Sequence, residues 1–314
     1  MLVKPPPLLP SDTVGIVAPG SAPIHAETFQ QGIRNLRASG LTVKPGNAPY
    51  PTRGYLSASD EERLREFHNY MSDPDVKALI CARGGYGCLR LLPFINYEMA
   101  RRHPKFLIGY SDVTALQMAL FRHAGLTSLA GPMVAPDWSD PDIPTIENFW
   151  RIAGGEFEDN WAGPTGELLV PINQGAVEGT LLGGNLSVIT RLIGTPYLPD
   201  LSGAILFVED VDEPPYRIDG MFAQMRNAGL LDEIGGLLIG SFTNENIDGP
   251  SLTVQQVVQD YVAPLSIPVA TNLMHGHIRS MNTMPIGVRA SLQVSRNEAH
   301  LTLLESACAE PVTT

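Results

Sequence analysis

The chain has 314 residues, of which 44% are hydrophobic and 17% are charged, and its formal net charge is −12. This composition excludes an intrinsically disordered chain, and the length exceeds the usual span of one hydrophobic core, so two domains are expected. The acidic balance makes duplex nucleic acid and anionic membrane surfaces poor partners, because both are bound through basic patches. No signal-peptide pattern and no run of about 18 apolar residues is present, so the sequence predicts a cytoplasmic protein.

The first half of the chain alternates predicted strands with predicted helices. Apolar runs that suit short buried strands occupy residues 14–18, 76–81, 106–108 and 127–130. Helical patterns occupy residues 26–38, 60–71 and the segment after 111, and Ser59 with Glu62 forms a capping box before the second of them. This alternation predicts an α/β fold with a doubly wound, mostly parallel sheet.

Two glycine-containing turns follow predicted strands of this half. The segment 83–87, Arg-Gly-Gly-Tyr-Gly, comes soon after the strand at 76–81. Gly84 and Gly85 allow the backbone to approach a ligand and to direct amides at it, which suits an anion or oxyanion site, although a plain turn fits equally well. The segment is neither a dinucleotide fingerprint nor a Walker motif, and no cofactor is predicted. The turn at 17–21 is interpreted as structural.

The tetrad Gly109-Tyr110-Ser111-Asp112 stands between the strand at 106–108 and the helical pattern that follows. A strand, turn and helix in this order place the Ser111 side chain at the carboxyl end of a strand, where α/β sheets bind ligands. The amides that follow, beginning with Asp112, stand at a helix N-terminus, where they can hold a developing oxyanion. Ser111 is also a preferred N-cap residue, so the tetrad alone leaves both a cap and a nucleophile open.

A linker is expected at 153–167, because this stretch mixes Gly, Glu, Asp and Trp161. The expected domains are therefore an N-terminal α/β domain at 1–152 and a mixed α/β C-terminal domain at 168–314. In the second domain, strand-like runs occupy residues 168–170, 177–182, 204–208 and 235–240, and helical patterns occupy residues 185–193, 218–228 and 254–262. Residues 290–294 and 300–304 suit a closing hairpin.

A serine nucleophile needs a base and a group that orients the base. In the second half, the acidic pair Glu209-Asp210 follows one strand-like run, and two histidines, His275 and His277, follow another. The order serine, acid, histidine is that of the α/β-hydrolases. Their elbow motif has a glycine where Val113 stands, however, so an ordinary α/β-hydrolase is not predicted.

Metal chemistry has little support in the sequence. Cys81, Cys88 and Cys308 form no metal-like pair, and their odd number suits a reducing compartment. His275 and His277 would share one face of a strand, as metal ligands can, but no cysteine or second carboxylate cluster completes a ligand set. No metal site is therefore predicted.

Taken together, the motifs resemble the LD-carboxypeptidases, a family of serine peptidases that includes muramoyltetrapeptide carboxypeptidases and microcin C immunity peptidases. The matching segments are 14–21, 82–93, 107–116, 178–190, 205–226 and 276–287. They span nearly the whole chain, and their combined order and spacing are specific. The resemblance implies an N-terminal α/β domain and a C-terminal domain, a site at their junction and, usually, a homodimer.

The resemblance also implies roles for particular residues. Ser111 is implied to be the nucleophile, His277 the general base and Glu209 the carboxylate that orients His277. The oxyanion hole is implied to consist of the Asp112 amide and a glycine amide of the Gly84-Gly85 turn. The implied activity is the release of terminal D-alanine from murein tetrapeptides at an L,D bond in peptidoglycan recycling.

Two other functions remain open. The segments 82–87 and 215–219 resemble the peptidoglycan-recycling branch, whereas Trp150 and Trp161 near the linker keep open an immunity peptidase that cleaves aminoacyl nucleotide analogues. Two hydrophobic anchors on a loop are the simpler interpretation of these tryptophans. A non-catalytic protein that binds a small molecule on the same scaffold would require Ser111 and His277 to lie far apart.

A carboxypeptidase must bind the terminal carboxylate of its substrate, and arginine suits that bidentate contact. Arg83 leads into the glycine turn, and Arg279 lies two residues after His277. Both arginines are therefore candidates, and the alternative for each is a pairing with a local acid.

Overall fold

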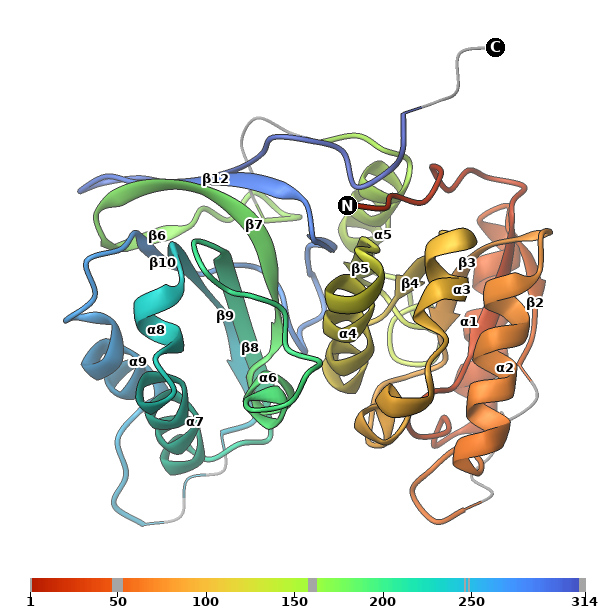
Figure 1. Ribbon diagram of the computed structural model, residues 1–314, viewed down its shortest axis with the longest axis horizontal. Coiled ribbons are helices and arrows are strands. Elements are labelled where there is room, and N and C mark those ends of the chain that lie inside the picture. The colour runs from red at the N-terminus through yellow and green to blue at the C-terminus, as the bar shows by residue number, and fades with distance from the viewer. Residues whose placement is uncertain (1, 47–52, 158–162, 246, 248, 311–314) are drawn as a thin grey trace. The chain divides into compact units, whose positions relative to one another are not determined.

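The computed structural model describes residues 2–46, 53–157, 163–245, 247 and 249–310. The chain forms two units (Figure 1). The first comprises Met1–Glu156, Thr283–Gly287 and Ser306–Thr314, and the second comprises Phe157–Asn282 and Val288–Glu305. The expected domain boundaries at 152 and 168 stay a prediction, and part of the expected linker, including Trp161, lies outside the described residues. The structure adds that two late segments of the chain belong to the first unit.

The sheet of the first unit has the strand order β11-β5-β4-β3-β1-β2. Its strands are β1 (Thr13–Val17), β2 (Thr42–Lys44), β3 (Val76–Cys81), β4 (Phe106–Ile108), β5 (Ser128–Ala130) and β11 (Met284–Ile286). The pairings from β2 through β5 are parallel, whereas β11 pairs antiparallel with β5. This arrangement confirms the predicted doubly wound, mostly parallel sheet. Because β1 pairs with both β2 and β3, the connections diverge between β1 and β3, which is where such sheets bind ligands.

In the sequence, α-helices and short 3₁₀ helices alternate with these strands. They are α1 (Ala26–Ala38), α2 (Asp60–Ser72), η1 (Cys88–Arg90), η2 (Leu92–Phe94), α3 (Tyr97–Arg102), η3 (Ser111–Val113), α4 (Thr114–Ala124) and α5 (Ile143–Ala153). The helix α2 begins with the predicted capping box of Ser59 and Glu62. The helix α4 is buried from Thr114 to Leu120, and its C-cap is Gly125, which adopts the left-handed conformation with a φ of 68°.

The sheet of the second unit has the strand order β13-β12-β7-β8-β9-β10-β6. Its strands are β6 (Val170–Asn173), β7 (Gly175–Asn185), β8 (Ile205–Val211), β9 (Gly236–Thr243), β10 (Val269–Thr271), β12 (Arg289–Val294) and β13 (Ala299–Leu303). The strands β7 to β10 are parallel. The strand β6 pairs antiparallel with β10, β12 pairs antiparallel with β7, and β13 pairs antiparallel with β12. The sheet is therefore mixed, and β12 with β13 form the expected closing hairpin.

The helices of the second unit follow the parallel strands. They are α6 (Leu186–Leu192), α7 (Pro215–Asn227), α8 (Leu230–Glu233) and α9 (Val254–Val262). The unbroken apolar run of β8 is buried, as expected for a central parallel strand that is covered on both faces. Its last residues bring carboxylates to the carboxyl edge of this sheet.

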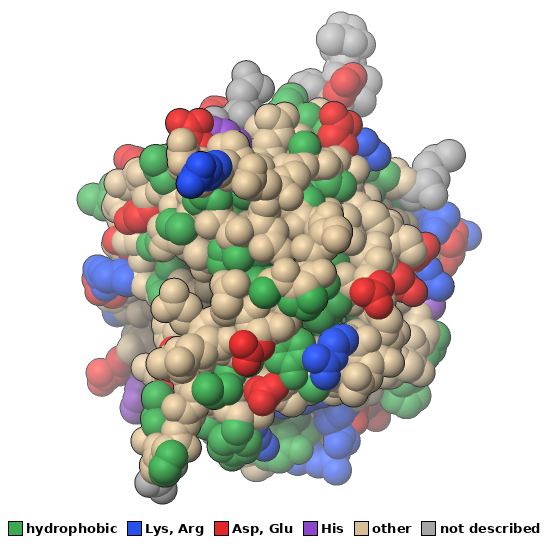
Figure 2. All heavy atoms as spheres, turned by 90° about the vertical axis from the view of Figure 1, so that its left-hand side faces the viewer, with side chains coloured by type: hydrophobic (Ala, Val, Ile, Leu, Met, Phe, Trp, Pro, Cys, Tyr) green, Lys and Arg blue, Asp and Glu red, His purple; other side chains and the backbone are tan. Residues whose placement is uncertain are grey.

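Charged side chains are sparse on the face drawn in Figure 2. This face lies on the side of β12 and α9 in Figure 1, and uncharged side chains and backbone make up most of it. The pattern agrees with the charged fraction of 17%. Among the residues that the structure describes, no helix is both long and apolar enough to span a membrane.

Candidate active site

Ser111 lies where β4 has ended and η3 leads into α4, which is the strand, turn and helix that the sequence predicts. Its φ is 63°, a left-handed conformation that is strained for a residue with a side chain. A strained strand-to-helix turn is the device that exposes a nucleophile at the top of a sheet. The N-caps of η3 and α4 are Tyr110 and Val113. Ser111 therefore caps neither helix, and the cap interpretation is wrong.

A buried glutamine holds the turn that precedes Ser111. Gln117 on α4 donates from Nε2 to the carbonyl oxygens of Gly109 and Leu129, each at 2.9 Å. Gln117 is fully buried, so water does not compete for these hydrogen bonds. The Gly109 carbonyl is thereby tied to β5, and the backbone that enters Ser111 has a fixed course. The sequence contained no pattern that distinguished Gln117 from other polar residues on a helix.

The glycine turn lies against Ser111. A Cβ atom added to Gly84 would stand 2.9 Å from Ser111 Cβ and 3.1 Å from its Oγ, so a glycine is needed for this approach. Within the described part of the chain, the amides of Gly84 and Gly85 donate no hydrogen bond. Amides that are unengaged, on a backbone that contacts a serine, suit the stabilisation of an oxyanion.

The turn after β1 braces the glycine turn from the other side. The Ser21 amide donates to the Gly84 carbonyl at 3.1 Å, and Ser21 Oγ accepts from the Tyr86 amide at 3.1 Å. Gly85 has a φ of 93°, and a Cβ atom there would stand 2.4 Å from Ser21 Oγ. The turn at 17–21 therefore has a structural role, as the sequence predicts, and it holds the turn that carries the predicted oxyanion residues Gly84 and Gly85.

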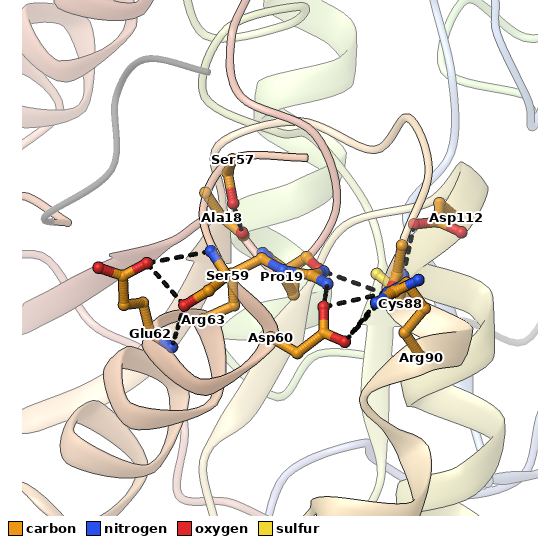
Figure 3. A network of polar contacts seen from close by, with 11 residues as sticks. Ala18, Pro19, Ser57, Ser59, Asp60, Glu62, Arg63, Cys88, Arg90 and Asp112 are labelled. Carbon is orange, nitrogen blue, oxygen red and sulfur yellow. Dashed lines mark hydrogen bonds and ion pairs between the residues drawn. The ribbon is translucent and has the colours of Figure 1, made fainter. Parts of the chain in front are cut away.

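Asp112 adds a further contact to this cluster. Its side chain is buried, and Oδ2 accepts from the Cys88 amide at 2.9 Å, as Figure 3 shows. Cys88 is the first residue of η1, which follows the glycine turn. The residue next to Ser111 thus also anchors the far end of the glycine turn.

In the second unit, Glu209 and His277 form a hydrogen-bonded pair. His277 Nδ1 lies 2.8 Å from Glu209 Oε2, and the Glu209 carboxylate is fully buried, whereas 21% of the His277 side chain is exposed. A carboxylate accepts only, so the imidazole carries its proton on Nδ1, and Nε2 is left to accept a proton. This is the arrangement that orients a histidine as a general base.

Two glycines make room for this pair. A Cβ atom at Gly276 would stand 3.0 Å from Glu209 Oε2, and one at Gly240 would stand 3.3 Å from Glu209 Cβ. Gly276 also has a φ of 131°, which side chains disfavour. The Gly276-His277 sequence thus carries the histidine close to a carboxylate that lies 68 positions earlier in the chain.

The neighbouring histidine has a different environment. His275 is fully buried, and its Nδ1 lies 2.8 Å from the carbonyl oxygen of Asn282. Burial lowers the pKa of His275, so its ring stays neutral at physiological pH. Its contact closes the loop that bears His277. The structure therefore gives the two histidines different partners, Asn282 for His275 and Glu209 for His277.

Asp210, the residue after Glu209, supports the neighbouring helix. Its carboxylate accepts from Asn185 Nδ2 at 2.9 Å and from the Ser187 amide at 2.8 Å, at the start of α6. Burial is the main cause that raises the pKa of Asp210 to about 6. The sequence analysis does not identify Asn185 as an N-cap residue. The signal for it is an asparagine that follows two glycines and precedes a helical pattern.

The two candidate arginines lie in different surroundings. Arg83 is half-buried between β3 and the glycine turn, and Arg279 is exposed in the loop after His277. The structure thus divides the candidates between the two units. The first unit holds Ser111, Asp112, Gly84, Gly85 and Arg83, and the second unit holds Glu209, His277 and Arg279.

Comparison with known proteins shows a relationship along both units. Residues 14–131 match the LD-carboxypeptidase N-terminal domain, and residues 178–292 match the LD-carboxypeptidase C-terminal domain. A probable murein peptide carboxypeptidase of Bacillus subtilis is 36% identical over 94% of this chain and 93% of its own length. The microcin C7 self-immunity protein of Escherichia coli is 27% identical over 94% of each chain. The crystal structure of a muramoyltetrapeptide carboxypeptidase from Oxalobacter formigenes superposes with a TM-score of 0.82 and 31% identity, covering 93% of this chain and 98% of that one.

Proposed function

Because this chain belongs to the LD-carboxypeptidase family, a family of hydrolases, we propose that it is a serine carboxypeptidase that releases terminal D-alanine from murein tetrapeptides. The observation that carries the proposal is the strained turn at Ser111, with the Gly84 backbone against its side chain. The strained backbone conformation of this serine costs free energy of folding, and it contributes nothing to stability that an ordinary turn would not. The same arrangement suits a nucleophile beside an oxyanion hole, because the serine lies next to unengaged amides.

In the proposed reaction, Ser111 Oγ attacks the carbonyl carbon of the L-centre that precedes D-alanine, and His277 Nε2 takes the hydroxyl proton. The tetrahedral oxyanion accepts hydrogen bonds from the Asp112 amide and from the amides of Gly84 and Gly85. His277 then gives the proton to the leaving amine of D-alanine. Water, activated by the same imidazole, hydrolyses the acyl-enzyme.

Glu209 has two effects on the imidazole in this reaction. Its hydrogen bond to Nδ1 keeps the proton on that nitrogen, so that Nε2 is the basic atom. Its negative charge, which is buried and shielded from water, stabilises the imidazolium that forms after proton transfer.

The decisive experiment is mass spectrometry of purified murein tetrapeptide after incubation with wild-type protein and with Ser111→Ala. We expect the wild-type protein to release D-alanine and the variant to be inactive, with an unchanged circular dichroism spectrum. Undiminished turnover by the variant would remove the serine mechanism. A folded wild-type protein that binds the tetrapeptide without cleaving it would instead indicate a non-catalytic binding protein.

The same assay separates the two candidate substrates within the family. An aminoacyl-sulfamoyl nucleotide replaces the tetrapeptide in a parallel reaction at equal concentration. We expect a higher kcat/KM for the tetrapeptide. A strong preference for the nucleotide would assign the chain to the immunity branch, to which the Escherichia coli relative belongs by its name.

A further inference from the structure

Arg63 on α2 is an arginine with only 2% of its surface exposed. Its Nη1 donates to the carbonyl oxygen of Pro19 (Figure 3). The same atom donates to the carbonyl oxygen of Gly87 at 3.2 Å. Its Nη2 forms an ion pair with Asp60 Oδ1 at 2.6 Å. Pro19 follows β1 and Gly87 closes the glycine turn after β3, so one guanidinium connects the turns of two neighbouring strands.

The network continues from Asp60 to the helix that follows the glycine turn. Arg90 on η1 donates to Asp60 from Nε at 3.0 Å and from Nη2 at 2.7 Å. Cys88, also on η1, is held by Asp112. The segment from Gly84 to Arg90 is therefore fixed at both ends, by Ser21 at its start and by the Arg63 and Asp60 pair at its end.

Burial of the Arg63 guanidinium costs desolvation free energy that an apolar side chain would not cost. Desolvation of an ion pair often cancels its Coulomb attraction, and apolar residues of the same volume are frequently as stable. What the guanidinium supplies, and an apolar side chain cannot, is a set of hydrogen bonds with defined directions. At Gly87 the fit is close, because a Cβ atom there would stand 2.8 Å from Arg63 Nη1.

We propose that Arg63, anchored by Asp60, is a positioning residue that holds the glycine turn so that the amides of Gly84 and Gly85 face the developing oxyanion. The proposal rests on the proposed serine mechanism. Its physical basis is that oxyanion stabilisation depends on donors fixed in advance, and that a displacement of about 1 Å can reduce the rate by about a hundredfold. Arg63 touches no reacting atom, and it acts through the turn.

Arg63→Met tests this role, with Arg65→Met as the matched control on the same helix. Arg65 is exposed and pairs with Glu61 one turn away. We expect Arg63→Met to lower kcat by about 10- to 100-fold while KM changes less than about threefold, since the lost interaction exists only in the transition state. Arg65→Met should keep both constants within about twofold.

A second measurement separates positioning from general loss of structure. A peptide boronic acid mimics the tetrahedral oxyanion, and the tripeptide product mimics the ground state. Arg63→Met should weaken boronate binding by the factor lost in kcat and leave tripeptide binding unchanged. Equal weakening of both ligands, or an unchanged kcat, would overturn the proposal.

Asp60→Asn and Arg90→Met provide the test if Arg63→Met does not fold. Both leave the hydrogen bonds of Arg63 Nη1 in place and loosen its outer anchor, so we expect a smaller loss of kcat, about three- to tenfold, again with KM maintained. Unchanged kcat in both variants would contradict the role of the anchor. Ser111→Ala is measured in parallel. If Ser111→Ala remains active, the proposed function fails. If Ser111→Ala is inactive but the variants at Arg63, Asp60 and Arg90 keep the wild-type kcat, only the positioning role is rejected.

Discussion

Glu209 is fully buried. Its Oε2 contacts His277, and its Oε1 has no hydrogen-bond partner among the described residues. A carboxylate held in this way in the interior is costly unless a positive charge develops beside it. Protonation of His277 during the reaction would supply that charge, so the pair is arranged for a transient imidazolium.

We therefore predict that Glu209→Gln lowers kcat by roughly a thousandfold or more while the fold is retained. The amide has nearly the same volume, but it carries no charge, and its NH₂ group can hold the imidazole in the wrong tautomer. The measurement is kcat on the tetrapeptide together with the thermal midpoint. Glu178→Gln, at an exposed glutamate on β7, is the control, and a loss in both variants would argue against a specific role for Glu209.

Gly84 provides a second prediction at the scale of a residue. Gly84→Ala introduces a methyl group 2.9 Å from Ser111 Cβ, so the turn or the serine must move. We expect kcat/KM to fall at least about tenfold. Gly220→Ala is the control, because Gly220 is exposed on α7 with no atom within 4 Å of an added Cβ. That change should leave activity intact and raise the free energy of unfolding by about 0.5 to 1 kcal/mol.

At the scale of elements, the end of β8 is linked to the start of α6. Asp210 on β8 accepts hydrogen bonds from Asn185 and from the Ser187 amide, while Asn185 Oδ1 accepts from the Val188 amide as the N-cap of α6. The strand that carries Glu209 and the helix beside it are thus joined through side chains. This joint fixes where β8 ends, and therefore where Glu209 stands.

The joint predicts a pH dependence of stability. Burial raises the pKa of Asp210 to about 6, whereas an unfolded chain has about 3.9 for this group. Between about pH 4 and pH 6 the folded protein binds the Asp210 proton more tightly than the unfolded chain does. The contribution of Asp210 to the free energy of unfolding therefore falls as the pH rises across this range, by about 2 to 3 kcal/mol. Asp210→Asn removes this titration, although it also weakens the hydrogen bonds to α6.

The measurement is the thermal midpoint of both proteins from pH 4 to pH 7. The difference, wild type minus Asp210→Asn, should decrease with rising pH, because the wild-type protein alone must ionise a buried carboxyl group. Asp212→Asn, at an exposed aspartate just beyond β8, serves as the control. A difference for Asp210→Asn that stays constant across this range would contradict the assignment.

At the scale of the whole molecule, the proposed residues are divided between the two units. The proposed nucleophile and oxyanion amides belong to the first, and the proposed base and its carboxylate belong to the second. The two arginines that are candidates for carboxylate recognition are divided in the same way. A cytoplasmic location and a homodimer stay predictions from the sequence.

We predict that one of the variants Arg83→Ala and Arg279→Ala lowers kcat/KM by at least about thirtyfold, which corresponds to ~2 kcal/mol. The reason is the loss of a bidentate contact to the terminal carboxylate. The same variant should lose much less on a tetrapeptide whose terminal carboxylate is amidated. Equal losses on the two substrates would show a structural arginine and place carboxylate recognition elsewhere.

The sequence by itself determined the features that are local in the chain. The strand before Ser111, the glycine turns and the capping box of α2 were all predicted, because each depends on a short pattern of apolar residues, glycines or caps. The family resemblance implies roles for Glu209 and His277 and not for their neighbours Asp210 and His275. These local patterns do not determine which residues far apart in the sequence come into contact.

The tertiary structure determined those long-range contacts. It brought His277 to Glu209 across 68 positions, and it placed β11 in the sheet of the first unit, beside β5, although most of the second unit lies between them in sequence. It also buried Arg63, which the sequence presents as an ordinary charge near the start of a helix, beneath the turns of β1 and β3. The physical reason is that burial and partners depend on the packing of whole elements, which no short window of sequence contains.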